Sequence, residues 1–458
     1  MKRCATMWPL VFLLIAAVPV RTGAQAAAKN PTPQAGNAPT SVAPTAPPQA
    51  AVTGVQAEAA PQQGYTLSPA QAAKAVAYAR ARHELYFLDF LYGVILLLLM
   101  LQLRIAPKFR DWAARAGDNR FVQAVIFAPL FLLTLDVASL PTEIWGQWVE
   151  LKFDQSIQGW GSFMMDWAKT EAIGVAIGIL LIWILYAVIH KSPRRWWFYF
   201  WLASVPLIIL GAIASPLIVE PLFFNFTHLD QTQPQLVARI ENVVQRAGLD
   251  IPPSRIFEMN ASSKLKSVNA YATGLGASKR VVVWDTTLQR MTQDEILFTL
   301  GHEIGHYVLL HVAKGISFAC GVLLLFLYLG YRFLGGMIAR WGGGWGIRGP
   351  DDFASLPALL LLLSVFSILF TPIENAYSRH LEHQADQYGL EIIHGIVPDA
   401  PVVAAHAFQI LGEVDLEEPN PTAFEKFWFY NHPPLDERIR FAESYDPWSR
   451  GQSPEFVK

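Results

Sequence analysis

Six long apolar segments dominate the pattern of hydrophobic and polar positions along the chain. They cover residues 85–103, 121–140, 172–190, 196–219, 316–338 and 354–372. Each is long enough to cross a bilayer at about 1.5 Å rise per residue, although the last has only marginal length. The pattern therefore predicts a mainly α-helical, multi-span membrane protein with six spans.

The N-terminal residues follow a different pattern. Residues 1–26 combine a charged start, a short apolar stretch and a small-residue Ala-Gln-Ala end, which is typical of a signal peptide. An N-terminal anchor, which would give a seventh span, is the alternative interpretation. Residues 27–64 are rich in Ala and Pro with few large apolar side chains, so we expect a disordered linker. Ser68, placed before Pro69, is a typical N-cap of the first ordered helix.

These patterns divide the rest of the chain into five parts. The predicted parts are membrane helices at 65–220, an insert at 221–315, membrane helices at 316–372, a C-terminal segment at 373–445 and a tail at 446–458. In the insert, an amphipathic helix at 235–247 precedes three short β-branched or aromatic runs that predict strands. The runs lie at 255–259, 269–273 and 280–284, with a Gly-Leu-Gly turn at 274–276. We expect a small α+β domain.

The composition agrees with a membrane protein and excludes several functions. The chain has 458 residues, of which 53% are hydrophobic and 16% charged. Its formal net charge of −2 gives no support for binding nucleic acid, and two distant cysteines cannot form a disulfide framework. The partner that the composition itself predicts is the lipid bilayer; the peptide or protein substrate, with or without an attached lipid, is expected from the motifs described below.

The charged loops predict an orientation in the membrane. Loops 104–120 and 191–195 are rich in Arg and Lys, whereas the alternate connection at 141–171 is acidic and rich in Trp. Basic loops stay in the cytoplasm by the positive-inside rule. This places residues 220–315 and 373–458 together on the opposite side. With the signal-like segment, the prediction is a bacterial inner membrane with a periplasmic catalytic side.

The candidate chemistry begins with an H-E-x-x-H motif. His302 and His306 are four residues apart, so a helix places both imidazoles on one face, where they can bind one Zn²⁺ ion. Glu303 lies beside them and can take a proton from a water that the metal activates. Thr292 and Glu295 form the capping-box pattern that predicts the start of this helix.

A catalytic zinc needs a third protein ligand. The best candidate is Glu382, which lies after the last apolar span. Asp386, four residues later, would share its helix face and accept the second ring N–H of a ligating histidine. A proton-donor role for Asp386 is also conceivable. His380 and His383 compete for the ligand position on this evidence.

Two further candidates lie near the C-terminus. His432 precedes two prolines, which restrict its backbone, and it could donate to the oxyanion of a tetrahedral intermediate. Arg438 could bind a substrate carboxylate with two hydrogen bonds. The alternative interpretation is an ordinary turn with a surface arginine.

The ordered set of motifs resembles the type I CAAX prenyl endopeptidases over residues 66–445. The matching motifs are His302-Glu303-x-x-His306, Asn269-Ala270-Tyr271, Trp284-Asp285-Thr286, Ser378-Arg379 through Glu382 to Asp386, and His432-Pro433-Pro434 through Arg438. The resemblance implies a ring of membrane helices around a water-filled chamber. It also implies zinc held by His302, His306 and Glu382, with Glu303 as the base. Asn269 and His432 would then hold the substrate and stabilise the transition state, and Tyr271 and Arg438 would join them in binding it.

The expected activity is hydrolysis of membrane-associated or CAAX-like peptides by a zinc metalloendopeptidase. Residues 262–268 lack the histidine and serine pattern of that family, and its eukaryotic members act on the cytosolic side. Two alternatives therefore stay open. One is a quality-control protease resembling the HtpX heat-shock protease, which has fewer spans. The other is a membrane scaffold in which zinc is structural and His380 or His383 fills the fourth position.

Overall fold

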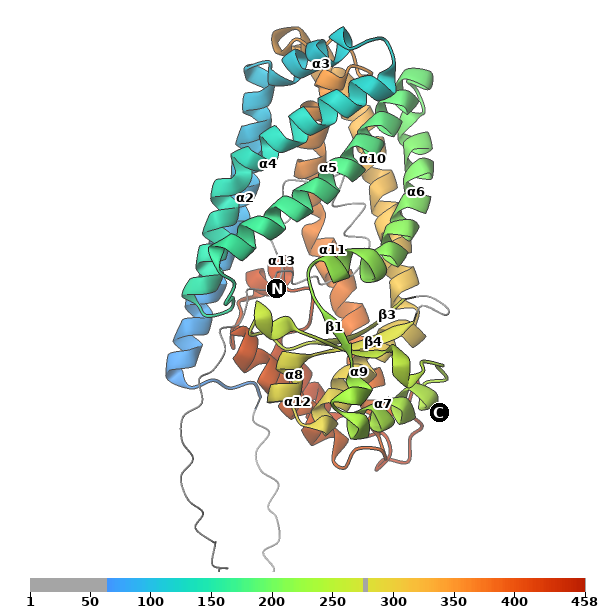
Figure 1. The fold of residues 1–458 in the computed structure, drawn as a ribbon. Coiled ribbons are helices and arrows are strands. Elements are labelled where there is room, and N and C mark those ends of the chain that lie inside the picture. The colour runs from blue at the N-terminus through green and yellow to red at the C-terminus, as the bar shows by residue number, and fades with distance from the viewer. Residues whose placement is uncertain (1–63, 275–278, 458) are drawn as a thin grey trace, which may run out of the picture.

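The computed structural model describes residues 64–274 and 279–457, and Figure 1 shows its fold. The expected signal segment at 1–26 and nearly all of the expected linker at 27–64 lie outside the described residues. Most of the expected turn at 274–276 does so as well. The membrane helices form the upper part in this view, and the sheet and the shorter helices form the lower part.

Six helices in the described part of the chain are long and apolar enough to cross a membrane, as the hydrophobic pattern predicted. They are α2 (Pro69–Gln102), α4 (Arg120–Lys152), α5 (Trp160–Lys191), α6 (Trp196–Ala214), α10 (His311–Trp345) and α11 (Leu356–Ile393). A π-helical turn, Ser215–Val219, and a 3₁₀ turn, Glu220–Leu222, extend α6.

The six helices form a closed ring. Each helix packs against the next in the order α2, α4, α5, α6, α10 and α11, and α11 packs back against α2. The short helix α3 (Ile105–Arg115) joins α2 to α4 at the end of the ring far from the sheet (Figure 1). The ring confirms the arrangement that the family resemblance implied.

The first membrane helix differs from the prediction. The predicted span began at residue 85, whereas α2 is one continuous helix of 34 residues that begins at Pro69. Its N-cap is Ser68, as predicted, and Gln71 completes a capping box. No Gly or Pro lies between residues 70 and 92, so nothing in the sequence ends the helix at the change from polar to apolar composition.

A four-stranded sheet lies below the ring. The strands are β1 (Phe226–His228), β2 (Ile256–Met259), β3 (Ala270–Thr273) and β4 (Arg280–Trp284), in the order β1-β2-β4-β3. The parallel pair β2–β4 is flanked by antiparallel neighbours on both sides. Three of these strands were predicted, and β1 was not. Since β3 is an outer strand of this sheet, one of its edges has no neighbouring strand in the described part of the chain.

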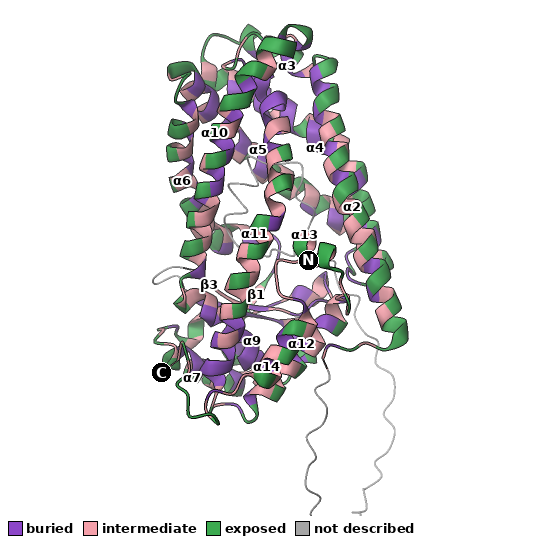
Figure 2. Ribbon diagram, turned by 180° about the vertical axis from the view of Figure 1, so that it is seen from behind, coloured by how far each residue is buried: buried purple, intermediate pink, exposed green. Residues whose placement is uncertain are grey.

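Helix α9 (Gln293–Val308) is the centre of the lower part. It packs against β3 and against α7 (Pro234–Arg246), α10, α11 and α12 (Ala400–Asp415). The remaining helices here are α8 (Asp285–Arg290), α13 (Ala423–Phe429) and α14 (Leu435–Ser444). Figure 2 shows buried residues concentrated along α9 and its neighbours. This burial fixes the H-E-x-x-H helix rigidly between the sheet and α11.

Candidate metal centre and active site

Helix α9 presents both histidines of the motif on one face. Thr292 and Glu295 form the predicted capping box, with the Thr292 backbone N–H donating to Glu295 Oε2 at 2.7 Å. Ten residues later the Nε2 atoms of His302 and His306 lie 3.1 Å apart. Both imidazoles therefore point their Nε2 atoms at the same place.

A close helix crossing brings α11 to this face. Gly389 of α11 packs directly on the backbone of α9, and a Cβ at this position would lie 3.0 Å from His302 N and 3.2 Å from His302 Cα. Gly301 is equally restricted, because its Cβ would lie 2.7 Å from Ile392 Cγ2. Glycine at both positions permits the approach that carries Glu382 to the histidines.

The three predicted metal ligands meet at one point. Glu382 Oε2 lies 3.3 Å from His302 Nε2 and 3.7 Å from His306 Nε2. A tetrahedral zinc ion with bonds of about 2.0–2.1 Å holds its ligand atoms about 3.3 Å apart. The triangle of 3.1, 3.3 and 3.7 Å therefore has the size that zinc requires. Among the described residues, this trio is the cluster whose donor atoms could hold a metal ion.

The surroundings of Glu382 support the same conclusion. Its Oε2 atom is buried without a hydrogen bond of good geometry. The Nε2 atom of His432 also lies 3.0 Å from this oxygen, so three imidazole nitrogens surround it. A buried carboxylate oxygen in such a cage is a natural metal ligand, and the donor set of two histidines and one glutamate suits zinc.

Asp386 orients His302. The Asp386 Oδ1 atom lies 2.8 Å from His302 Nδ1, on the side of the ring away from the other ligands. Burial lowers the pKa of His302, but its contacts with Asp386 and Glu382 raise it by more, to about 9. The two carboxylates thus make the position favourable for positive charge, which a metal ion supplies.

Arg438 completes this side of the site, but in a different role from the predicted one. Its Nε and Nη2 atoms donate to the two Asp386 oxygens at 2.8 and 2.5 Å, and its guanidinium lies 4.2 Å from the ring centre of Phe408. Burial lowers the pKa of Arg438 and Asp386 raises it by more, so the group stays charged. The substrate-carboxylate role is not supported here, because the planar fork already binds Asp386.

The other ligating histidine has a different outer partner, which the sequence interpretation missed. His306 Nδ1 lies 3.0 Å from His311 Nδ1, and His311 Nε2 lies 3.1 Å from Gln384 Oε1. His311 is buried at the start of α10, directly after a left-handed residue, Leu310 (φ 57°). The available signal was a third histidine five residues after the motif.

His432 reaches the centre through an anchored loop. Helix α11 holds the chain before it, since Asn375 Nδ2 donates to Trp428 O at 2.6 Å and Arg379 donates to the carbonyls of Lys426 and Tyr430. His432 then places Nε2 beside Glu382, while its Nδ1 lies 2.7 Å from Asn431 Oδ1. Helix α11 therefore supplies the candidate ligand Glu382, the Asp386 carboxylate beside His302 and the residues that anchor the loop of His432.

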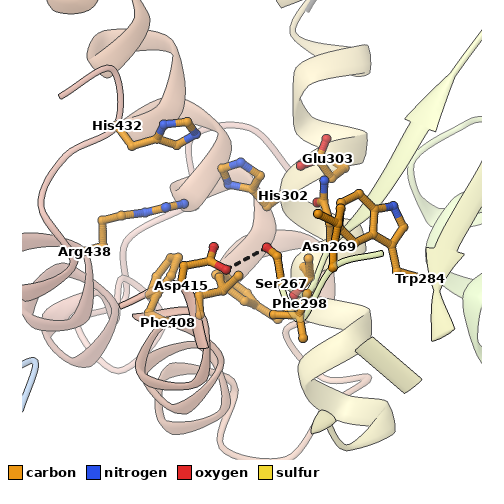
Figure 3. Close-up of a pocket in the computed structure, with 14 residues that line it drawn as sticks. Ser267, Asn269, Trp284, Phe298, His302, Glu303, Phe408, Asp415, His432 and Arg438 are labelled. Carbon is orange, nitrogen blue, oxygen red and sulfur yellow. Dashed lines mark hydrogen bonds between the residues drawn. The ribbon is translucent and has the colours of Figure 1, made fainter. Parts of the chain in front are cut away.

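Of the two predicted substrate-binding residues near β3, only Asn269 lines the site. Its backbone is fixed by Thr287, whose Oγ1 exchanges hydrogen bonds of 2.7 Å with Asn269 N and O, and its side chain lies next to Glu303 (Figure 3). Tyr271 is not among the residues that line the cavity, and its hydroxyl donates to Glu220 Oε2 at 2.8 Å. Residues two apart on a strand share a face, so this hydrogen bond, and not the alternation of side chains, directs the hydroxyl of Tyr271 to Glu220.

A small cavity opens beside the candidate ligands. Its volume is about 80 Å³. The lining includes His302, Glu303, Asn269, His432 and Arg438, and Figure 3 shows these side chains around it. A substrate carbonyl in this space would lie within reach of a metal ion, a carboxylate base and an imidazole. His380 and His383, the competing ligand candidates, do not take part in this cluster.

Comparison with known proteins agrees with this geometry. The profile of Peptidase family M48 matches residues 230–446, and that of the CAAX prenyl protease N-terminal region, five membrane helices, matches residues 54–225. The chain is 33% identical to the uncharacterized metalloprotease YhfN of Bacillus subtilis, over 86% of this chain and 89% of that one. The chain belongs to peptidase family M48.

More distant members of the family extend the comparison. The M48 chain is 25% identical to the human CAAX prenyl protease 1 homolog, over 74% of this chain and 77% of the human one. Its fold matches the crystal structure of S. mikatae Ste24p with a TM-score of 0.71, covering 83% of this chain and 90% of that chain at 23% identity. The protein is therefore a multi-pass membrane metalloprotease related to the CAAX prenyl proteases.

Proposed function

We propose that this M48 protein is a zinc metalloendopeptidase that cleaves membrane-associated or CAAX-like peptides. His302, His306 and Glu382 hold the ion, and Glu303 is the general base. The main support for the proposal is the triangle formed by His302 Nε2, His306 Nε2 and Glu382 Oε2, whose sides measure 3.1 to 3.7 Å. Glu303 lines the adjoining cavity. Three protein ligands leave a fourth position for chemistry, which distinguishes a catalytic zinc from a structural one.

Each residue of the site has its own role in the proposed hydrolysis. His302, His306 and Glu382 would hold a Zn²⁺ ion, and the ion would supply Lewis acidity that makes water a better nucleophile near neutral pH. Glu303 takes the proton of the attacking water and passes it to the leaving amine. His432 donates to the developing oxyanion from Nε2. Asp386 and Arg438 keep His302 in the orientation that ligation needs.

The arrangement of the ring supports substrates that come from the membrane. The site lies at the end of the helix ring, and Glu382 belongs to one of the ring helices. Relatives at about a quarter identity carry the name CAAX prenyl protease 1, whereas the name of the relative at 33% identity gives no substrate. We therefore include CAAX-like peptides, with or without a lipid, in the proposed substrate class.

The distribution of charge supports one orientation. The basic loops at 104–120 and 191–195 lie at the end of the ring opposite the sheet (Figure 1). Placing them in the cytoplasm puts the metal centre on the other side, which in a bacterial inner membrane is the periplasm. Reporter fusions at the C-terminus test this: alkaline phosphatase should be active there and green fluorescent protein dark.

The decisive experiment separates metal binding from catalysis. Purified wild-type protein and Glu303→Gln are compared for zinc content by elemental analysis and for cleavage of quenched fluorescent peptides, prenylated and unprenylated. We expect full zinc occupancy in both proteins, cleavage by the wild type that a chelator stops, and a loss of at least 10³-fold in the variant. Glu413→Gln, an exposed acid on α12, is the control. Normal turnover by Glu303→Gln would refute the mechanism.

A further inference from the structure

The short helix α13 has an outward face made of apolar side chains. Ala423, Phe424 and Phe427 are exposed, Phe424 by 56% and Phe427 by 53%. Residues three and four apart are neighbours on a helix surface, so these three share one face. Glu425 and Lys426 lie elsewhere on the helix and contact ionisable partners on α2 and α14. The usual arrangement of a surface helix, with its apolar side inward and its polar side outward, is therefore reversed.

This exposed face of α13 lies beside the surface that α2 presents to lipid. Exposed apolar side chains recur at helical spacing along this membrane helix, at Phe87, Leu91 and Leu98. The ring centre of Phe87 lies 5.9 Å from that of Trp428 and 5.6 Å from that of Phe429. Figure 2 shows α13 between α11 and α2. The apolar surface of the membrane helix therefore continues onto α13.

Two tryptophans of α4 indicate the level in the membrane at which α13 lies. Trp145 and Trp148 follow the apolar stretch 121–140 and are exposed by 51% and 49%. Exposed tryptophan is enriched where a bilayer meets water. A Cβ on Gly146, between them, would lie 3.5 Å from Leu85 Cδ2 of α2. Since α13 contacts α2 two residues before and two residues after Leu85, it lies at the same level as these tryptophans.

Helix α13 leads directly into the loop that carries His432. It ends at Phe429, three residues before His432, whose Nε2 lies 3.0 Å from Glu382 Oε2. Asn375 and Arg379 of α11 hold the chain on one side by hydrogen bonds to its carbonyls. Lipid around the exposed face would hold α13 from the other side, because burial of aromatic rings in apolar surroundings is favourable.

We propose that α13 is an interfacial membrane helix, with Phe424 and Phe427 between the headgroups and the acyl chains of the bilayer, and that this contact holds the loop of His432 in place. The bilayer is the occupant because the exposed face adjoins the lipid-facing surface of α2. The location of α13 is independent of the proposed function, whereas its effect on cleavage rests on that function.

The first test measures where the exposed face lies. A nitroxide label is attached to Phe424→Cys or Phe427→Cys in full-length protein whose two own cysteines are replaced by serine, in phosphatidylcholine–phosphatidylglycerol nanodiscs. Electron paramagnetic resonance then compares collisions with oxygen, which concentrates in lipid, and with a nickel chelate, which stays in water. We expect both labels to favour oxygen, as a label at Leu91→Cys should. Val402→Cys, an apolar position 65% exposed on α12, is the control and should favour nickel.

Two results of this test would overturn the proposal. Labels at both positions that collide mainly with the nickel chelate would show that the exposed face of α13 meets water. Protection from the chelate that appears only after a prenylated peptide is added would show that the face binds the lipid of a substrate instead of the bilayer.

The second test measures the effect on the loop of His432. Phe424→Ser combined with Phe427→Ser is assayed in the same nanodiscs with a short water-soluble peptide. We expect kcat to fall about tenfold, with KM and zinc content unchanged, because a displaced His432 stabilises the transition state less well. Phe424→Trp combined with Phe427→Trp keeps a preference for the interface and should keep wild-type kcat. Val402→Ser, which removes an exposed apolar side chain from α12, is the control and should also keep it.

The two tests separate this inference from the proposed function. Labels that favour oxygen, in a protein whose wild type cleaves no peptide, would refute the peptidase function and support the membrane contact. An unchanged kcat in the serine variant, or an equal loss in the tryptophan variant, would overturn the role of the contact in holding His432.

Discussion

The close approach of α9 and α11 can be tested by the substitution Gly389→Ala, which adds one methyl group at their contact. Gly389→Ala places a Cβ 3.0 Å from His302 N, 3.2 Å from His302 Cα and 3.2 Å from Phe298 Cε2. Two of these neighbours are helix backbone atoms, which cannot rotate away. The helices must therefore separate by a few tenths of an ångström at the level of His302, which lies about two turns along α11 from Glu382.

The two consequences of this separation differ in size. Overpacking costs about 1–3 kcal/mol of folding free energy, and the better helix propensity of alanine offsets about 1 kcal/mol of it. The net loss of stability is then about 1 kcal/mol. Metal sites tolerate about 0.2 Å of error in ligand distances, so the metal centre is more sensitive than the fold. We expect zinc affinity to fall about tenfold or more, and kcat/KM by about 100-fold.

The assay compares zinc affinity, peptide cleavage and thermal unfolding in the same detergent. Zinc affinity is measured by competition with a chromophoric chelator. Gly321→Ala on α10 is the matched control, because no atom lies within 4 Å of the position where its Cβ would be. The control should keep wild-type values in all three measurements. If Gly389→Ala also kept wild-type zinc affinity and turnover, the argument that this glycine sets the ligand geometry would be wrong.

Three other predictions follow from the contacts around the site. Asp386→Asn should weaken zinc binding 10–100-fold in the chelator assay, because it removes the charge facing His302 Nδ1; unchanged affinity would exclude an orienting role. His311→Ala should weaken zinc binding about tenfold through His306, and a loss of activity without any change in zinc affinity would contradict this explanation. Glu391→Gln should lower the free energy of unfolding by about 1–3 kcal/mol, because this buried carboxylate accepts hydrogen bonds from the backbone N–H groups of residues 455–457. The midpoint of thermal unfolding should fall accordingly, and an unaltered midpoint would show that these hydrogen bonds to the tail do not contribute to stability.

The elements that the sequence predicted well are those with local signals. The capping box at Thr292 and the four-residue spacing of His302 and His306 are properties of a single helix. The spacing of Glu382 and Asp386 likewise predicted that they share one face of a helix, and both lie on α11. Hydrophobic length was enough to identify all six membrane helices, because lipid imposes a minimum length on a span.

The features that the sequence did not predict depend on contacts between distant segments. β1 has three residues and gains its stability from pairing with β2, so it leaves almost no local pattern. The hydrogen bonds of Arg438 to Asp386 were not predicted, because the two residues are 52 positions apart in sequence and no local pattern shows that they are 2.5 Å apart in space. Tyr271 was assigned to substrate binding through the Asn269-Ala270-Tyr271 motif, and the motif gives no sign of the hydrogen bond between its hydroxyl and Glu220.

The order of the proposed ligands along the chain has a consequence for biogenesis. His302 and His306 precede α10, whereas Glu382 follows the membrane portion of α11. The chain must cross the bilayer and return between the second ligand and the third. A protein whose synthesis or insertion stops before residue 382 therefore holds only two of the three ligands, and it cannot form the metal centre. Peptidase activity is in this way linked to completed membrane insertion, which keeps an unfinished chain from cleaving other proteins.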